Sequence, residues 1–144
     1  MSFVRILVHT VWATKNRIPY LNDTIREEVI QHIRQYAIAK GIFIDHINGE
    51  KEHLHVLISM SKNQRIAEIM QFLKGESSFW INKHKKTKFK FEWQDDYYAV
   101  SIGISQLEIL REYIRNQVSN HRKASFEDEI DLLIREYGLE KVRD

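Results

Sequence analysis

The chain has 144 residues, of which 43% are hydrophobic and 11% aromatic, so we expect a single domain over residues 1–144 with one well-filled core. Cysteine is absent, which excludes disulfides, thiolate metal sites and cysteine nucleophiles. No apolar run approaches the roughly 20 residues of a membrane span, and the start of the chain does not have the pattern of an export signal. We therefore expect a cytoplasmic protein without a membrane partner. The net charge of +2 excludes no partner by itself.

The first two predicted elements are a strand and a helix. Residues 3–14 are rich in Val, Ile, Thr and Trp, a composition typical of a long strand. Thr24 and Glu27 have the spacing of a capping box, which predicts that a helix begins there. Its apolar residues recur with helical period as far as Lys40, and a glycine follows.

Two further strands are predicted over 42–47 and 53–59. They flank Asn48 and Gly49, and an Asn-Gly pair between two strand-like segments is a strong signal for a tight hairpin turn. The sequence therefore predicts that these strands pair with each other in antiparallel fashion.

The rest of the chain alternates helical and strand patterns, and Ser-x-x-Glu/Asp capping boxes mark the last two helix starts. The predicted elements are a helix over 64–84, a strand over 97–103, a helix from Ser105 to about His121 and a helix from Ser125 to Tyr137. The order of elements predicts an α+β fold: a ferredoxin-like split βαβ antiparallel sheet with two helices on one face, followed by two C-terminal helices. The residues that cover the other face of the sheet then determine the function.

The strand over 53–59 carries a pair of histidines. Its even positions are apolar, whereas His53 and His55 are two residues apart. Side chains of a strand alternate between its faces, so both imidazoles point to the face opposite the core. Imidazole nitrogens bind several divalent metals. The pair is therefore either a part of a metal site that needs a further ligand, or two ordinary surface residues.

The helix that begins at Ser105 offers the further groups. Its apolar residues have helical spacing and are expected to pack on the sheet; they are Leu107, Leu110, Ile114, Val118 and His121. Tyr113 and Gln117 are four residues apart, so they lie next to each other on a neighbouring side of this helix. Taken alone, they are also compatible with an aromatic at the core boundary and a solvated amide.

Together these segments resemble the HUH single-tyrosine transposases of bacterial insertion sequences, the IS200-like type, and are close to the REP-associated tyrosine transposases. The resemblance covers nearly the whole chain. Its segments are Val11-Trp12-Ala13-Thr14-Lys15, His53-Leu54-His55 with Val56-Leu57-Ile58, Phe91-Glu92-Trp93-Gln94, Tyr113-Ile114-Arg115-Asn116-Gln117 and the tail from Ser125-Phe126-Glu127-Asp128-Glu129 onward.

The resemblance implies a bacterial transposase that cuts and rejoins single-stranded DNA. Tyr113 would be the catalytic nucleophile and would form a covalent 5′-phosphotyrosine. His53, His55 and Gln117 would hold one Mg²⁺ or Mn²⁺ ion. The implied partners are single-stranded or hairpin DNA and a second copy of the chain in a homodimer, with active sites formed within one subunit or between two.

Basic residues cluster near the start of the chain and between the end of the helix predicted over 64–84 and the strand predicted over 97–103. We expect them to contact the DNA backbone, although a solvated lysine-rich loop has the same composition. They are Lys15, Arg17, Lys83, Lys85, Lys86 and Lys88. Trp93, Tyr97 and Tyr98 are candidates for stacking on unpaired bases, and Trp93 is equally compatible with the core. The remaining histidines, among them His9, His32, His46 and His84, have no partner at ligand spacing and are assigned to structural or surface roles.

A two-histidine phosphoesterase needs two His-x-Thr/Ser motifs, and no histidine of the chain is followed two places later by Thr or Ser. A binding module that grips DNA hairpins without cutting them stays open as the alternative to the transposase.

Overall fold

The structure is a computed structural model and describes residues 1–117 and 125–137. It has four strands, two short 3₁₀ turns and four α-helices within the described residues. In chain order these are β1 (Ile6–Ala13), η1 (Lys15–Arg17), α1 (Asp23–Ala39), β2 (Phe43–Glu50), β3 (His53–Met60), α2 (Ile66–Lys83), β4 (Tyr98–Ile102), η2 (Ile104–Gln106), α3 (Leu107–Arg115) and α5 (Phe126–Tyr137). No described helix is long and apolar enough to cross a membrane.

The strands form one antiparallel sheet in the order β2-β3-β1-β4. This is the predicted ferredoxin-like arrangement, in which β1 and β3 are the two central strands. Val11 lies opposite His55 and Ala13 opposite His53 in the β1–β3 register. The two histidines therefore belong to the middle of the sheet, near the end where β1 finishes.

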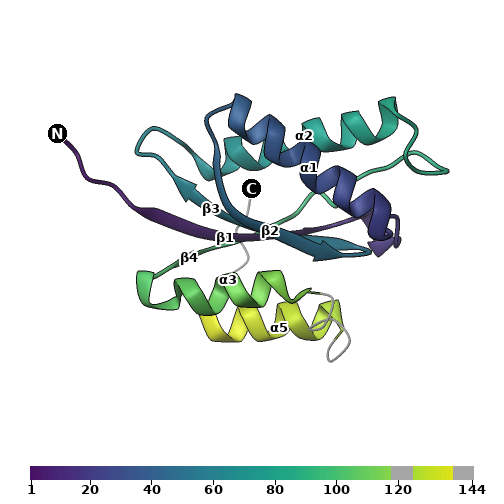
Figure 1. Cartoon of the computed structure of the whole chain (residues 1–144). Helices are drawn as coiled ribbons and strands as arrows, with labels where there is room; N and C mark the ends of the chain where they lie inside the picture. The colour runs from purple at the N-terminus through teal and green to yellow at the C-terminus, as the bar shows by residue number, and fades with distance from the viewer. Residues whose placement is uncertain (118–124, 138–144) are drawn as a thin grey trace.

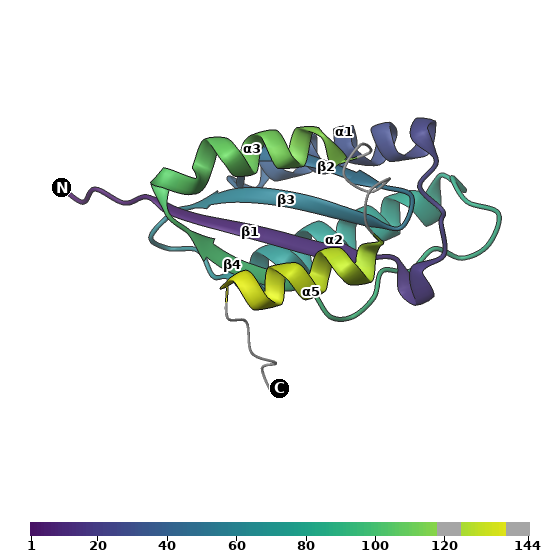
Figure 2. The same cartoon turned by 90° about the horizontal axis from the view of Figure 1, so that it is seen from below.

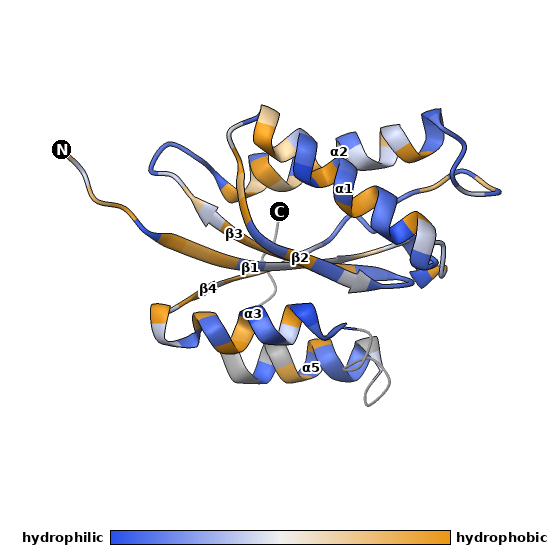
Figure 3. Ribbon diagram, in the orientation of Figure 1, coloured by the Kyte–Doolittle hydropathy of each residue, from blue (hydrophilic) through white to orange (hydrophobic). Residues whose placement is uncertain are grey.

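Helices cover both faces of the sheet (Figure 1). α1 and α2 lie on one face, and α3 and α5 lie on the other. Seen onto the second face, α3 follows the β2–β3 side and α5 the β1–β4 side (Figure 2). Hydrophobic residues run along β1 between the two helical layers (Figure 3). A strand that is covered on both faces needs apolar residues on both, which agrees with the six apolar residues among the eight of β1.

The larger core lies between the sheet and the layer of α1 and α2. Val29, Ile33 and Ala37 of α1 pack there against Leu54 and Val56 of β3, and none is more than 1% exposed. This spacing follows the predicted helical period of α1. The opposite face has a smaller cluster, formed with α3 by Leu7, Leu57, Ile102, Leu107, Leu110 and Ile114. The apolar stripe predicted for this helix is confirmed for its described members.

Two details at element boundaries differ from the sequence-based expectation. α1 is capped by Asn22, whose Oδ1 accepts a hydrogen bond from the Ile25 backbone N–H at 3.0 Å, and not by Thr24. Asn48 and Gly49 are paired residues of β2, opposite His55 and Leu54, so the tight turn lies after them at Lys51 and Glu52. An Asn-Gly pair favours a turn, but here the pairing with β3 continues past it.

Gly49 is required by a close approach of two chain segments. A Cβ atom on this residue would lie 2.2 Å from the carbonyl oxygen of His53 and 2.7 Å from the Leu54 side chain. Only a residue without a side chain fits at that distance. The hairpin therefore brings β2 against the start of β3 at the position of the first histidine.

The C-terminal helices also differ slightly from the prediction. The Gln106 side chain accepts a hydrogen bond from the Gly103 backbone N–H at 3.1 Å, so the chain turns into α3 at these residues and not at a Ser105 capping box. α3 ends at Arg115, and the predicted continuation through Val118 to His121 lies outside the described residues. At α5, Ser125 Oγ accepts from the Asp128 backbone N–H at 3.2 Å, as predicted.

Candidate metal centre

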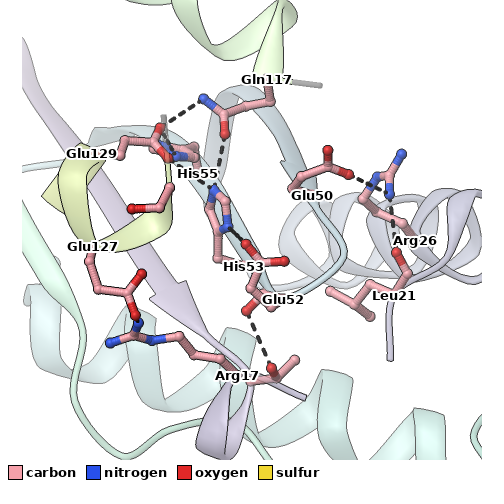
Figure 4. Close-up of polar contacts among 12 residues, drawn as sticks. Arg17, Leu21, Arg26, Glu50, Glu52, His53, His55, Gln117, Glu127 and Glu129 are labelled. Atoms are coloured by element: carbon pink, nitrogen blue, oxygen red, sulfur yellow. Dashed lines mark hydrogen bonds and ion pairs between the residues drawn. The ribbon is translucent and has the colours of Figure 1, made fainter. Parts of the chain in front are cut away.

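The histidine pair lies on the face of β3 that α3 and α5 cover. Leu54, Val56 and Ile58 point to the larger core, whereas His53 and His55 point to the opposite side, as the alternation predicts. Both imidazoles are completely buried. Their ring centroids are 5.1 Å apart (Figure 4). They are not surface residues, and buried imidazoles require polar partners.

α3 and the residues after it bring Tyr113 and Gln117 to this pair. Ile114, which is fully buried against the sheet, fixes the rotation of the helix, so the preceding residue faces the histidines. The Tyr113 ring meets the His55 ring edge-on at 5.7 Å between centroids. Gln117 follows the end of α3, is fully buried, and its Oε1 lies 3.1 Å from His53 Nε2. The four predicted residues thus form a series of contacts from Tyr113 through His55 and His53 to Gln117.

A fifth residue, Glu129 of α5, joins them, and the sequence analysis did not identify it. Its carboxylate Oε1 lies 2.9 Å from His55 Nε2, and its Oε2 lies 3.4 Å from His53 Nε2. Oε1 also accepts hydrogen bonds from the Tyr113 hydroxyl and from Gln117 Nε2, the latter at 3.2 Å. Glu129 is only 6% exposed. The carboxylate is therefore the point at which all four predicted residues meet.

The packing of α5 explains how Glu129 reaches the site. The next residue, Ile130, is buried against Val11 and Ala13 of β1. Ala13 is the register partner of His53, so the contact places the first turn of α5 beside the histidines. At the same end of the helix, Glu127 forms an ion pair with Arg17 of η1 (Figure 4).

The carboxylate and the imidazoles perturb one another's pKa values. Burial acts to lower the pKa of His53, but hydrogen bonds to Glu129 and Glu52 outweigh it and raise the pKa to about 9. Burial acts to raise the pKa of Glu129, yet its contacts with His53 and His55 bring the pKa below its ordinary value. The pKa of fully buried His55 is lowered, chiefly by burial. The carboxylate and His53 therefore stabilise each other's charged forms, whereas burial favours the neutral form of His55.

The same groups fit a divalent metal ion. One ligand atom from each of His53, His55 and Glu129 lies within 4.8 Å of the others. Within the described residues, His55 Nε2 and Glu129 Oε2 are buried and form no hydrogen bond. His55 Nε2 does lie 2.9 Å from Glu129 Oε1, and this contact is an ion pair by distance. Buried polar atoms without hydrogen bonds are rare in proteins, and a bound cation satisfies such atoms. A buried His-His-Glu group of this kind can bind a metal ion.

His9 is also part of this environment, contrary to the expectation that it lacks a partner. It is 1% exposed, and its Nε2 lies 2.9 Å from His55 Nδ1. Burial lowers the pKa of His9 to about 3, with the neighbouring His55 as a second cause. The alternation along β1 places residue 9 on the same face as Val11, but a single sequence does not show which strand lies next to it.

The predicted DNA-contacting cations are not gathered at the metal centre as one group. Arg17 is nearest, through its ion pair with Glu127. Lys15 pairs with Glu92 at 3.4 Å and Lys86 with Glu28 at 2.6 Å. The others belong to the end of α2 and the segment that follows it, and are Lys83, Lys85 and Lys88.

Trp93 belongs to the larger core. It is 6% exposed, and its Nε1 donates to Ser77 Oγ at 2.8 Å, which satisfies its only polar atom. The core interpretation of Trp93 is therefore correct, and the base-stacking one is wrong.

A polar groove with a volume of about 600 Å³ lies beside the metal centre. It runs between η1, the segment before β4 and the first turn of α5, and its lining includes Thr14, Asn16, Arg17, Gln94, Tyr98 and Glu127. Asn16 and Arg17 both have positive φ, 56° and 53°, so the chain is in an uncommon conformation where it borders the groove.

Comparison with known proteins places these residues in a family. Residues 2–117 match the family model described as "Transposase IS200 like". The chain belongs to the IS200-like transposase family. The matched segment includes four of the five residues in contact at the site, and Glu129 lies beyond it. No curated protein matches the sequence.

Solved transposase structures share the fold of this family member. A candidate transposase from Deinococcus radiodurans is 22% identical, with a TM-score of 0.64, and the match covers 81% of this chain and 93% of that one. A REP-associated tyrosine transposase bound to a REP hairpin is 14% identical, with a TM-score of 0.63, and the match covers 88% of this chain and 73% of that one. The predicted α+β sheet with helices packed on it is confirmed.

Proposed function

We propose that the protein cleaves and rejoins single-stranded DNA by metal-dependent transesterification, with Tyr113 as the nucleophile. One observation carries the proposal: the Tyr113 hydroxyl and His55 Nε2 both contact the same oxygen, Glu129 Oε1. The nucleophile therefore lies beside the proposed cation ligands, and a phosphate held by a cation at these ligands would be within its reach. Holding nucleophile and phosphate together in this way is a main source of catalytic rate.

The cation site is assigned to His53, His55 and Gln117, with Glu129 as a further oxygen donor. Two imidazole nitrogens suit Mn²⁺ better than Mg²⁺, which prefers an all-oxygen shell, so Mn²⁺ is the better fit of the two predicted ions. When bound, the ion supplies Lewis-acid stabilisation of the charge that develops on the phosphate. Burial of all four side chains keeps water away and strengthens these electrostatic contacts.

The covalent chemistry is carried by Tyr113. Its phenolic oxygen loses a proton and forms a bond to phosphorus, the bond from phosphorus to the 3′ oxygen breaks, and that oxygen takes up one proton in turn and leaves as a 3′ hydroxyl. The product is a 5′-phosphotyrosine, and attack by another 3′ hydroxyl reverses the reaction and seals the strand. An unperturbed tyrosine has a pKa of about 10, so the phenol needs a neighbour that takes up its hydrogen. Glu129 Oε1 accepts that hydrogen bond.

The groove beside the centre is assigned to the DNA strand. Its volume of about 600 Å³ accommodates a nucleotide. Its polar lining combines Asn16 and Arg17 with the carboxylates of Asp96 and Glu127, so Arg17 is the lining residue that can pair with a phosphate. Lys15 lies next to it in the chain, and Lys83, Lys85, Lys86 and Lys88 provide further positive charge for phosphates. The REP-associated relative is bound to a DNA hairpin, which supports hairpin DNA as the ligand class.

We also propose a homodimer, as the sequence resemblance implies. All of the proposed catalytic residues are in contact within one chain, which supports active sites that each belong to a single subunit.

The alternative function is a module that binds hairpins without cutting them. The hydrogen bond of the Tyr113 hydroxyl to Glu129 Oε1 favours it. In that case the carboxylate keeps the Tyr113 hydroxyl hydrogen-bonded, and no adduct forms.

A covalent-adduct assay separates these functions. A hairpin oligonucleotide with a single-stranded flank and a 3′ label is incubated with protein and Mn²⁺, and the label is followed on a denaturing gel. Wild type should form a labelled protein adduct, whereas Tyr113→Phe should bind the hairpin equally well and form none. Tyr36→Phe, in α1 on the other face of the sheet, is the matched control and should keep the adduct.

Further outcomes of this assay are also informative. His55→Ala should lose the Mn²⁺-dependent adduct because one ligand of the ion is gone. An adduct that persists in Tyr113→Phe would assign the nucleophile elsewhere. Hairpin binding by wild type without any adduct in Mn²⁺ would support the non-cleaving module instead.

A further inference from the structure

The two imidazoles of the metal centre are each held at their second nitrogen, but by different chemical groups. His53 Nδ1 lies 3.1 Å from a carboxylate oxygen of Glu52, in the β2–β3 turn. His55 Nδ1 lies 2.9 Å from Nε2 of His9 in β1. The His9 and His55 rings are stacked, with centroids 5.1 Å apart and an interplanar angle of 20°. Both rings are buried, so neither contact is shared with solvent.

The hydrogen bond between His9 and His55 determines what His55 can offer to a cation. An imidazole that binds a metal through Nε2 carries its hydrogen on Nδ1. That hydrogen needs an acceptor, and His9 Nε2 is placed to accept it. The hydrogen of His9 is then on its own Nδ1. The pair therefore has one arrangement in which the lone pair of His55 Nε2 points towards Glu129 and the other ligands.

We infer that His9 is a positioning residue that holds the ring of His55 and accepts the Nδ1 hydrogen of the tautomer that binds a cation. This inference rests on the cation site proposed above. Groups that hold a metal-bound histidine at its other nitrogen typically raise metal affinity by about 10- to 100-fold. His9 contacts no ligand atom directly, so its contribution is made through His55 alone.

His9 differs from Glu52 because an imidazole can both accept and donate a hydrogen bond. A carboxylate such as Glu52 only accepts, so it keeps a hydrogen on His53 Nδ1. An imidazole accepts or donates. When His9 donates instead, His55 Nε2 carries the hydrogen and can share it with Glu129 Oε1, 2.9 Å away. His9 thereby lets His55 pair with the carboxylate before a cation binds and with the cation afterwards.

The burial of His9 argues against a purely structural role. Its Nδ1 is buried without a hydrogen-bond partner among the described residues. The neighbours on the same face of β1, Leu7 and Val11, are apolar and fill space without such an atom. A buried polar atom without a partner is destabilising, so an apolar residue would serve packing better. The contact of the other nitrogen, Nε2, with His55 explains why residue 9 is a histidine.

Cation affinity of purified variants tests the inference without any DNA cleavage. His9→Leu keeps the volume and removes the acceptor, whereas His9→Gln returns an acceptor near the position of Nε2. Titration calorimetry with Mn²⁺ should give a Kd for His9→Leu that is about 10- to 100-fold weaker than for wild type. His9→Gln should recover most of that loss. His32→Leu is the matched control, because His32 is a half-buried histidine stacked on Trp80 in the other helical layer, and its Kd should equal that of wild type.

The possible results are distinct. Equal Mn²⁺ affinity of folded His9→Leu and wild type would overturn the inference and leave the proposed function intact. A loss of affinity in His9→Gln as large as in His9→Leu, or an equal loss in His32→Leu, would also overturn it. Absence of Mn²⁺ binding by wild type would refute the cation site itself, and with it both proposals. If His9→Leu does not fold, as judged by circular dichroism, His9→Met provides the same test with a more adaptable side chain.

Discussion

The position of Tyr113 depends on the packing of α3, and Ile114 is the residue with which to test it. Ile114 is fully buried in the cluster between α3 and the sheet. Truncation of a buried isoleucine to alanine costs about 3 kcal/mol, within the usual range for such sites. For a domain of this size, each 1 kcal/mol corresponds to roughly 3 °C in Tm, so Ile114→Ala should melt about 10 °C below wild type.

The matched control lies on the opposite side of the same helix. Ile109 is 75% exposed, and Ile109→Ala should change the stability by no more than about 0.5 kcal/mol. Thermal unfolding of wild type and both variants is followed by circular dichroism in metal-free buffer. Equal Tm values for Ile114→Ala and Ile109→Ala would mean that α3 does not pack on the sheet as described. The convergence of Tyr113 with the histidines would then lose its physical basis.

Two other predictions concern charged groups. With free Mn²⁺ at 100 times its Kd, binding should stabilise wild type by about 2.7 kcal/mol, whereas a tenfold weaker Kd in Glu129→Gln should reduce the gain to about 1.4 kcal/mol. The increase in Tm on addition of Mn²⁺ measures this gain. Asp131→Asn in the same helix is the control and should respond as wild type does. An equal response of Glu129→Gln and wild type would show that the Glu129 carboxylate does not bind the ion. Hydrogen bonds from Arg111 are the largest cause that holds the pKa of Asp45 below its ordinary value. The ionised carboxylate therefore stabilises the fold above about pH 4. This contribution is lost as the pH falls through the folded-state pKa. The Tm of Asp45→Asn should therefore lie below that of wild type at pH 7 and approach it in acid, and a gap that is independent of pH would contradict this assignment.

Local patterns predicted much of the fold and part of the site. The alternation along β3 placed His53 and His55 on one face, because residues two apart on a strand always share a side. The helical period predicted that Leu107, Leu110 and Ile114 would face the sheet. These inferences need only geometry within a single element, and the structure confirms them.

The parts that sequence analysis missed depend on how separate elements meet. Glu129 stands in an acidic run with Glu127 and Asp128, and its period alone does not indicate that it points inward. Its role follows from the packing of Ile130 on β1. His9 likewise gained its partner only through the register of β1 with β3. At the Asn48-Gly49 pair, strand pairing outweighed a turn propensity that is correct in isolation.

Gly49 gives the candidate metal centre a steric dependence on a residue that has no side-chain functional group. The backbone that carries His53 passes so close to position 49 that an added methyl group would overlap the His53 carbonyl oxygen. Relief of that overlap would displace the start of β3, and the first imidazole would move with it. The candidate ligand set thus depends on a residue of the neighbouring strand that offers no ligand atom of its own.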